Sequence, residues 1–343
     1  MTQTTLPAFA FPSADLSEHA PAHTNTGGQT TELTVPASVS DGPPSRAEQI
    51  TLLCAVVLPL IGLGLAITFL WGRGITWLEL GLFVAMYVVT AGGITVGYHR
   101  LFTHSSFETP KFLRALFAIA GSMAVQGPVL TWVAVHRKHH QHSDHEEDPH
   151  SPHAHGGGVI GMLKGMWHAH VGWVFEPKPH GLARYVKDLI DDRTVLIVDK
   201  LFPLWVALGL ALPAVIAGIV TQSWTGALLG FLWGGVVRVF MVHHVTWSIN
   251  SVCHVWGTRP FKSHDQSTNN LVFGMLALGE GWHNNHHAFP TSAKHGLKWY
   301  QFDASYVFIK TLSLLGLARN VRVPSPDRIA SKLRESSPSQ TSH

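Results

Sequence analysis

Three clusters of histidine carry most of the chemistry that this sequence could perform. They are His99-Arg-Leu-Phe-Thr-His104, His136-Arg-Lys-His139-His140 and His283-Asn-Asn-His286-His287. On a helix, residues at i, i+3 and i+4 lie on one face. Each of the last two clusters can therefore direct three imidazoles at one point, and two such triplets facing each other can hold a pair of metals. Five residues advance a helix by about 140°, so His99 and His104 can both ligate only if a helix ends between them.

The number and type of ligands restrict the metal. A structural zinc takes four ligands and a catalytic zinc three, so eight clustered imidazoles fit two metals better than one zinc, and imidazole accepts iron as readily as zinc. Left without a metal, neighbouring imidazoles repel one another when protonated. The Glu-x-x-His motif of carboxylate-rich di-iron bundles is absent. A pair of haems is disfavoured too, because it needs histidines at mid-membrane and these clusters lie at the membrane edge.

Histidines outside the clusters have a simpler interpretation. We interpret His168, His180 and His295 as isolated residues that are either solvated or satisfied in a core. His243 and His244 lie deeper in an apolar segment and are interpreted as structural or as supporting the ligands.

The composition indicates a membrane protein. Only 13% of the residues are charged, and the apolar residues occur in long blocks. Lys and Arg (24) barely exceed Asp and Glu (21), and no basic run is interleaved with aromatic residues, which argues against nucleic acid as a partner. Cys54 and Cys253 are too few for a disulfide framework or a cysteine-based metal site. The 24 histidines must therefore do any metal binding.

Four segments are long and apolar enough to cross a bilayer, which needs about 20 residues. They pair into two hairpins and comprise residues 50–71, 77–98, 201–220 and 226–247. Trp71 and Trp77 flank the first turn at the depth of an interfacial aromatic belt. Residues 113–135 are also apolar, but Gln126-Gly127-Pro128 interrupts them, and a crossing there would separate His136 from His99 by about 30 Å. We therefore predict that residues 113–135 form a helix at the membrane interface. Residues 306–318 are also apolar but too short to span the bilayer.

Two hairpins bring all three clusters to one side of the membrane. Lys and Arg are dense in residues 100–200 and in the C-terminal segment, whereas the hairpin turns carry only Arg73. The positive-inside rule places the site and both termini in the cytoplasm, and we expect a bacterial inner membrane.

The predicted fold is an all-α membrane protein. Four transmembrane helices form two hairpins, and a cytoplasmic helical cap holds a histidine-ligated dimetal site. Residues 1–48 are rich in Thr, Ser, Pro and Ala and lack the pattern of a signal peptide, so we predict a disordered tail. Residues 49–320 form the membrane domain, and residues 321–343 form a second disordered tail.

The three clusters resemble the histidine boxes HRxxxH, HRxHH and HNxHH of membrane fatty acyl desaturases of the acyl-CoA Δ9 type. The resemblance extends from about Gly93 to Leu317 and includes the segment from His142-Ser-Asp144 to Asp148-Pro-His150, Asn250-Ser-Val-Cys-His254, Arg259-Pro260 and Gly279-Glu280-Gly-Trp282. It implies that His254 is a ninth metal ligand and that Asn250 contacts a metal through water. Asp144, Asp148 and Glu280 are candidates to accept the free N–H groups of ligating imidazoles.

The resemblance also implies the reaction. A desaturase of this kind inserts a cis double bond into a saturated C16–C18 acyl-CoA or acyl-lipid, here at carbon 9, with two Fe²⁺ ions, O2 and external electrons. The sequence has no fused cytochrome b5 with a His-Pro-Gly-Gly motif, so electrons must come from a separate donor such as a ferredoxin or cytochrome b5. A di-iron lipid hydroxylase is the alternative, because it uses the same kind of site and differs in how the chain is positioned.

Substrate-binding residues can be proposed from position alone. Bulk about two helical turns before His99 would close an acyl tunnel, and the candidates are Phe83, Met86 and Tyr87. A phosphate-bearing head group needs cations, and the candidates are Arg184, Lys187, Arg259 and Lys262.

Two other classes fit less well. A metal transporter needs ionisable residues along a path at mid-membrane, and the predicted spans show almost none before His243. A membrane metallohydrolase needs fewer ligands and a general base beside an open metal position.

Overall fold

The computed structural model describes residues 35–42, 44–70 and 75–334. Within these ranges the chain is helical, with isolated β-bridges and no strand. The helices are η1 (Ala37–Val39), α1 (Arg46–Leu70), α2 (Trp77–Gly92), η2 (Gly93–Thr103), α3 (Lys111–Ser122), α4 (Val129–His142), α5 (Gly158–His170), η3 (Gly172–Phe175), η4 (Leu182–Tyr185), α6 (Lys187–Ile190), α7 (Arg193–Lys200), α8 (Phe202–Thr221), α9 (Trp224–Gly230), η5 (Phe231–Val237), α10 (Arg238–Ser251), η6 (Val252–His254), α11 (Leu271–Leu276), α12 (His283–Ala288), α13 (Ala304–Leu314) and α14 (Pro326–Lys332).

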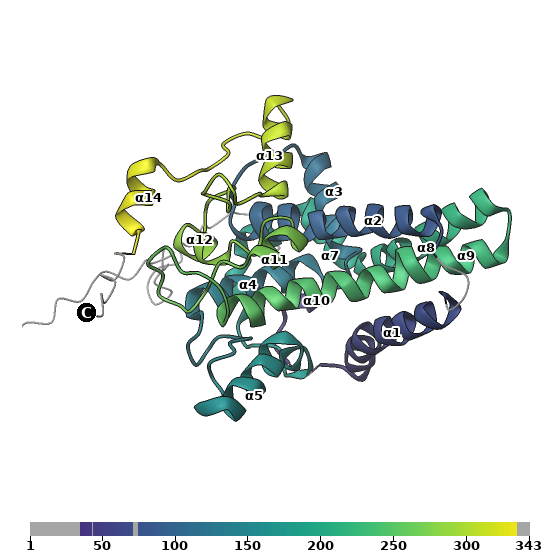
Figure 1. Ribbon diagram of the computed structural model, residues 1–343, viewed down its shortest axis with the longest axis horizontal. Helices are drawn as coiled ribbons and strands as arrows, with labels where there is room; N and C mark the ends of the chain where they lie inside the picture. The colour runs from purple at the N-terminus through teal and green to yellow at the C-terminus, as the bar shows by residue number, and fades with distance from the viewer. Residues whose placement is uncertain (1–34, 43, 71–74, 335–343) are drawn as a thin grey trace, which may run out of the picture. The chain divides into compact units, whose positions relative to one another are not determined.

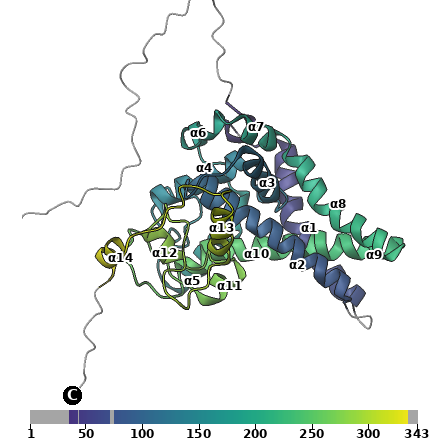
Figure 2. The same ribbon diagram turned by 90° about the horizontal axis from the view of Figure 1, so that it is seen from above.

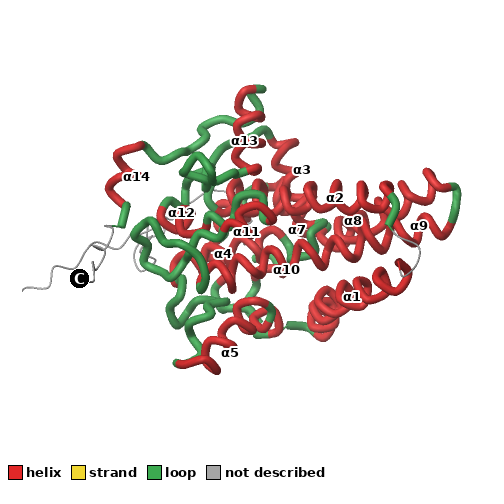
Figure 3. The backbone as a smooth tube through the Cα atoms, in the orientation of Figure 1, coloured by secondary structure: helices red, strands yellow, loops and turns green. Residues whose placement is uncertain are grey.

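Four helices in the described ranges are long and apolar enough to cross a membrane, as predicted. They comprise Arg46–Thr68, Trp77–Thr103, Phe202–Thr221 and Trp224–His254. The second and fourth run past the predicted ends, so they carry His99 and His254 into the cap. In Figures 1 and 2, α2, α8, α9 and α10 form one bundle, and α4, α12 and α14 lie at the end of the molecule opposite α9. Figure 3 shows that loops are concentrated at the same end as α12.

The second membrane helix changes its hydrogen-bonding pattern where it approaches the cap. α2 begins with a capping box between Thr76 and Glu79, which satisfies its first N–H groups. From Gly93 the backbone is a π-helix up to Thr103. A Cβ on Gly93 would lie 2.2 Å from the backbone nitrogen of Gly121 in α3, so only glycine permits this packing.

A fully buried arginine joins three helices inside the bundle. Pro213 lacks an N–H, so the Gly209 carbonyl of α8 loses its normal helical partner. Arg238 donates to that carbonyl at 2.9 Å and to the Met123 carbonyl, just past the end of α3, at 2.7 Å. Arg238 lies in the fourth span ahead of His243, so it is an exception within the expectation of almost no ionisable residue there. Hydrogen bonds to backbone carbonyls stabilise its charge.

The predicted interfacial segment is divided into two helices. α3 ends at Ser122 and α4 begins at Val129, on either side of the predicted break at Gln126–Pro128. Neither is long enough to span a bilayer of about 30 Å. α4 instead carries the second histidine cluster into the cap.

The described parts of both predicted tails are structured, so those boundaries need correction. Ser38 donates to Asp199 at 2.7 Å and its carbonyl accepts from Thr131. At the other end, α14 follows Arg322, whose N–H bonds to the Ser106 carbonyl. The polar composition of these segments predicted disorder, and a few tertiary contacts that composition does not reveal hold them in place. Residues 1–34 and 335–343 lie outside the described residues.

Candidate metal centre

Two groups of histidine nitrogens converge in the cap. The first group comprises His99, His104, His136, His140 and His286. The second group comprises His139, His254, His283 and His287. Within each group one ring nitrogen per residue lies within 4.8 Å of the others. These nine residues are the nine histidine ligands predicted from the sequence, and the structure brings all of them together.

The triplets do not each serve one point, which corrects the expectation from spacing. His136 and His140 belong to the first group, but His139 belongs to the second. On α12, His283 and His287 belong to the second group, and His286 to the first. Neighbouring residues are about 100° apart on a helix, so the adjacent histidines of each box diverge. Each box therefore contributes to both groups.

His99 and His104 meet at the end of a π-helix, which agrees with the expected helix end between them, because the helix ends at Thr103 and His104 is its C-cap. In a π-helix residue i+5 bonds to residue i, and the His104 N–H donates to the His99 carbonyl at 3.1 Å. This pairing stacks the two residues on one face, with ring centroids 4.8 Å apart. Sequence spacing read as an α-helix could not reveal this solution.

Ring-nitrogen distances test whether a metal fits. The Nε2 atom of His286 lies 3.0 Å from that of His99 and 2.9 Å from that of His140. In the second group, Nε2 of His254 lies 3.0 Å from that of His283. Nitrogens about 2.1 Å from a shared metal and at right angles are about 3.0 Å apart. The groups therefore have the spacing of metal ligands.

The hydrogen bonds of these imidazole rings also favour metal binding. The Nδ1 atoms of four ligands face carboxylates, at 2.7 Å (His99 to Glu280), 2.9 Å (His139 to Asp148), 2.8 Å (His254 to Asp144) and 2.6 Å (His287 to Asp265). Each Nδ1–H donates outward, which leaves the Nε2 lone pair directed into its group. The buried Nε2 atoms of His104, His139 and His287 have no hydrogen-bond partner. Converging lone pairs repel unless a cation binds them.

Asp265 is the carboxylate that sequence reasoning missed. Its side chain is fully buried, and its second oxygen accepts from Ser263 and from the Ser267 N–H, each at 3.0 Å. It lies 22 residues before His287, with no short spacing to identify it. The nearby Arg259-Pro260 segment was the one available signal.

Burial sets the protonation of the centre. It lowers the pKa values of His104 and His140 well below the usual range, and neighbouring imidazoles lower them further. The pKa of His287 falls to about 4 through burial, although Asp265 opposes this change. Burial alone would raise the pKa of Glu280, but His99, His295 and Arg100 together outweigh burial and hold that pKa well below its usual range. At neutral pH the His104, His140 and His287 imidazoles are therefore neutral and the Glu280 carboxylate is ionised.

His295 is not isolated, which corrects its interpretation. Its ring centroid lies 4.5 Å from that of His286, and its Nδ1 lies 3.2 Å from Glu280. Arg100, which is fully buried, pairs with Glu280 at 3.1 Å and with Asp303 at 2.9 Å. This network connects the first group to the N-terminus of α13, which Asp303 caps.

Asn250 and the tunnel candidates lie along the membrane helices. Asn250 is half-buried, one turn before His254. Met86 is buried, and Phe83 packs edge-on against Trp233 with centroids 6.4 Å apart. The Tyr87 hydroxyl donates to the Leu276 carbonyl at 2.7 Å. All three tunnel candidates therefore have contacts inside the protein.

The head-group candidates occupy two places. Arg184 stacks on Tyr185 and lines an open pocket of 650 Å³ together with Lys138, Lys178 and His180. Lys187 is exposed at the start of α6. Arg259 and Lys262 lie elsewhere, beside the C-terminal segment, so they do not line the pocket of Arg184, and only Arg184 and Lys187 remain candidates for the head-group site.

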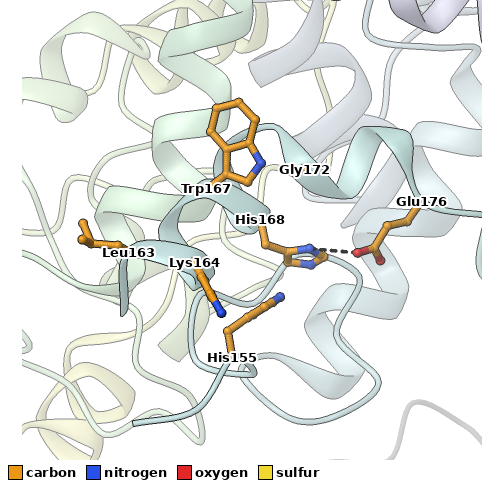
Figure 4. A pocket seen from close by; sticks show the side chains of 7 residues that line it. All are labelled: His155, Leu163, Lys164, Trp167, His168, Gly172 and Glu176. Carbon is orange, nitrogen blue, oxygen red and sulfur yellow. Dashed lines mark ion pairs between the residues drawn. The ribbon is translucent and has the colours of Figure 1, made fainter. Parts of the chain in front are cut away.

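A second open pocket, of 540 Å³, lies beside α5 (Figure 4). His168 pairs there with Glu176 at 3.1 Å and faces His155. The side of the pocket formed by α5 also includes Leu163, Lys164 and Trp167. None of its lining residues belongs to either histidine group, so this pocket is separate from the metal centre.

The fold and site define a four-span membrane protein whose cap holds a centre for two metals. A family model for fatty acid desaturases matches residues 75–312, and the chain belongs to the fatty acid desaturase family. It is 44% identical over 278 residues to a hex-5-enoyl-[acyl-carrier protein] acetylenase of Moorena producens, covering 80% of this chain and 87% of that protein. It is 41% identical to an sn-1 stearoyl-lipid 9-desaturase of Synechocystis (75% and 76% covered) and 38% identical to an acyl-CoA C20 Δ5-desaturase of Anemone leveillei (73% and 76%). The protein is thus a membrane oxidoreductase that acts on fatty acyl chains with O2.

Proposed function

We propose that this protein introduces a cis double bond at carbon 9 of a saturated C16–C18 acyl chain, using two irons, O2 and external electrons. The observation that carries the proposal is the division of nine imidazoles into groups of five and four, with carboxylates behind four of them. Nitrogen ligands in this number suit two iron ions.

The nine histidines would hold the irons, with Asn250 reaching one through a water molecule. When bound, the irons supply the O2-derived oxidant that unactivated methylenes require. The protein residues position the reactants and keep water out. Asp144, Asp148, Asp265 and Glu280 fix the orientation of the imidazoles, because each accepts the proton of an Nδ1 atom.

Substrate placement follows from the helices that carry the ligands. Phe83, Met86 and Tyr87 lie on α2, which continues into the helix bearing His99. We assign them to the closed end of the acyl tunnel. Arg184 and Lys187 would bind an anionic head group on acyl-CoA or another carrier, and the named relatives act on lipid-, CoA- and carrier-protein-linked chains. By the positive-inside rule the centre and both termini face the cytoplasm of a bacterial inner membrane.

Two other outcomes use the same site. A hydroxylase results if the chain is held so that oxygen is inserted after one hydrogen has been removed. The name of the Moorena relative adds acetylenic products, which require an alkene as substrate.

The test is expression in a bacterium that lacks oxygen-dependent desaturases, together with a ferredoxin or cytochrome b5 reductant. Double bonds are located in the fatty acids by mass spectrometry, with His139→Ala as the inactive control. The expected products are cis-9 C16 or C18 monoenes that require O2 and disappear in the variant. Hydroxylated or acetylenic chains would identify one of the other two reactions.

A further inference from the structure

A cluster of cations lies on the cap beside the metal centre, and we call it the basic face. It comprises Arg259, Lys262, Arg328, Lys332 and Arg334. Two segments distant in sequence form it, because Phe261 pairs with Leu333 in an antiparallel bridge. The Lys262 N–H bonds to the Lys332 carbonyl at 2.8 Å, and the Arg334 N–H to the Pro260 carbonyl at 2.9 Å.

The exposed side chains of the described part of the basic face carry more positive than negative charge. Lys262, Arg328 and Arg334 are exposed, and Asp327 is the one exposed carboxylate in residues 259–264 and 326–334. Burial lowers the pKa of Arg259, and the charge of Arg334 lowers it further. Like charges therefore lie close enough to repel one another, which an anionic partner would relieve.

The position of the basic face selects the kind of partner. In Figures 1 and 2, α14 lies at the end of the molecule opposite the α9 turn, away from the membrane-spanning bundle. Anionic lipid head groups act within about a Debye length of the bilayer, roughly 8–10 Å. A soluble protein can reach this end, whereas the head group of an inserted acyl chain stays near the bilayer.

The basic face is also joined directly to the ligands. Arg259 donates to the Asp265 carbonyl, and the Asp265 side chain bonds to His287. Lys332 donates to the Ala288 carbonyl at 2.6 Å, one residue after His287. The Phe261 N–H bonds to Asn284, one residue after His283. A partner seated here would lie a few bonds from the second group.

We propose that the basic face docks an acidic one-electron carrier protein that reduces the metal centre. This inference rests on the proposed function, in which one O2, two hydrogens of the chain, two electrons and two protons give a double bond and two waters. The carrier delivers the electrons one at a time and is itself oxidised. Opposite charges speed such encounters and orient the partners.

Binding and turnover test the proposal separately. The full-length, iron-loaded protein in nanodiscs is titrated with an acidic plant-type [2Fe–2S] ferredoxin at low and high salt. The triple variant Lys262→Gln, Arg328→Gln, Arg334→Gln keeps Arg259 and Lys332, whose side chains make the bonds to Asp265 and Ala288. The matched control is Lys111→Gln, Arg193→Gln, Lys200→Gln, which removes the same charge from exposed positions on α3 and α7.

We expect the triple variant to raise the ferredoxin Kd by about tenfold or more at low salt and to flatten its salt dependence. Its turnover with dithionite-reduced methyl viologen and its KM for the acyl substrate should match those of the wild type. An unchanged ferredoxin Kd, an equal effect in the control, or a raised acyl KM instead would overturn the proposal. If neither reductant yields a new double bond, the proposed function fails, and that result is distinguishable because ferredoxin binding is measured without turnover.

Discussion

The Asp265 carboxylate gives the sharpest test of how the centre is held. Burial alone would raise its pKa, but His287, His254 and Ser267 together outweigh burial and keep the pKa well below the usual range, so the group is anionic at neutral pH. Asp265→Asn preserves the shape and an accepting oxygen for the His287 N–H but removes the charge. Asp265→Ala removes the acceptor as well and leaves His287 free to rotate.

The expected magnitude follows from the contact. Oriented partners of metal-binding histidines are worth about 10–100-fold in metal affinity or activity. This contact is short, charge-assisted and buried, so solvent does not screen it. We expect about a tenfold loss of iron affinity in Asp265→Asn and about a hundredfold loss in Asp265→Ala, which correspond to about 1.4 and 2.7 kcal/mol.

Iron content after titration with a graded series of chelators measures this loss without turnover. Asp327→Asn, which changes an exposed carboxylate on α14, is the control and should retain wild-type iron. Wild-type chelator resistance in both Asp265 variants would show that the carboxylate does not support His287.

Two further predictions concern packing and pH. Gly93→Ala should lower the free energy of unfolding by about 1–3 kcal/mol, and with it the melting temperature and the iron content, because its Cβ would collide with the backbone of α3. Gly92→Ala, with open space at that position, is the matched control. Equal effects in both variants would contradict the packing argument. Asp192 caps α7 and pairs with Arg114 at 2.6 Å. Burial alone would raise the pKa of Asp192, but Arg114 lowers it. Asp192→Asn keeps the cap and should lower the free energy of unfolding by about 0.5–1 kcal/mol at pH 7. Because the folded pKa is depressed, that contribution is complete above the unfolded value of about 3.9 and disappears as pH falls through the folded value. Melting curves at pH 7 and near pH 3 measure it, with Asp191→Asn as the control. A difference that is as large near pH 3 as at pH 7 would refute the charge argument.

The histidine clusters and the membrane spans could be predicted from the sequence because both depend on local patterns. Apolar runs of about 20 residues indicate membrane helices whatever they pack against. Histidines at i, i+3 and i+4 indicate a shared helix face. The two hairpins that these runs form predict all three clusters on one side of the membrane, and the structure brings the histidines of all three together.

The parts that were wrong depend on tertiary contacts. The helix ends between His99 and His104 as expected, but its π-helical pattern was not predicted, and that pattern is accompanied by the close approach of α3 at Gly93. Asp265 has no regular sequence spacing to His287, its partner. Arg238 is tolerated in a membrane span because Pro213 leaves the Gly209 carbonyl of another helix free to accept its hydrogen bond. No pattern within one segment encodes such pairings.

The division of each box between the two groups explains why the centre is suited to two metals rather than one. α4 sends His136 and His140 to the first group and His139 to the second, and α12 reverses that allocation with His286 against His283 and His287. Rotating either helix to improve one group would withdraw ligands from the other, since the side-chain directions on a helix are fixed relative to one another. The two groups therefore constrain each other through two rigid elements. The buried carboxylates behind His139 and His287, one ligand from each helix, hold those elements in the one orientation that serves both groups.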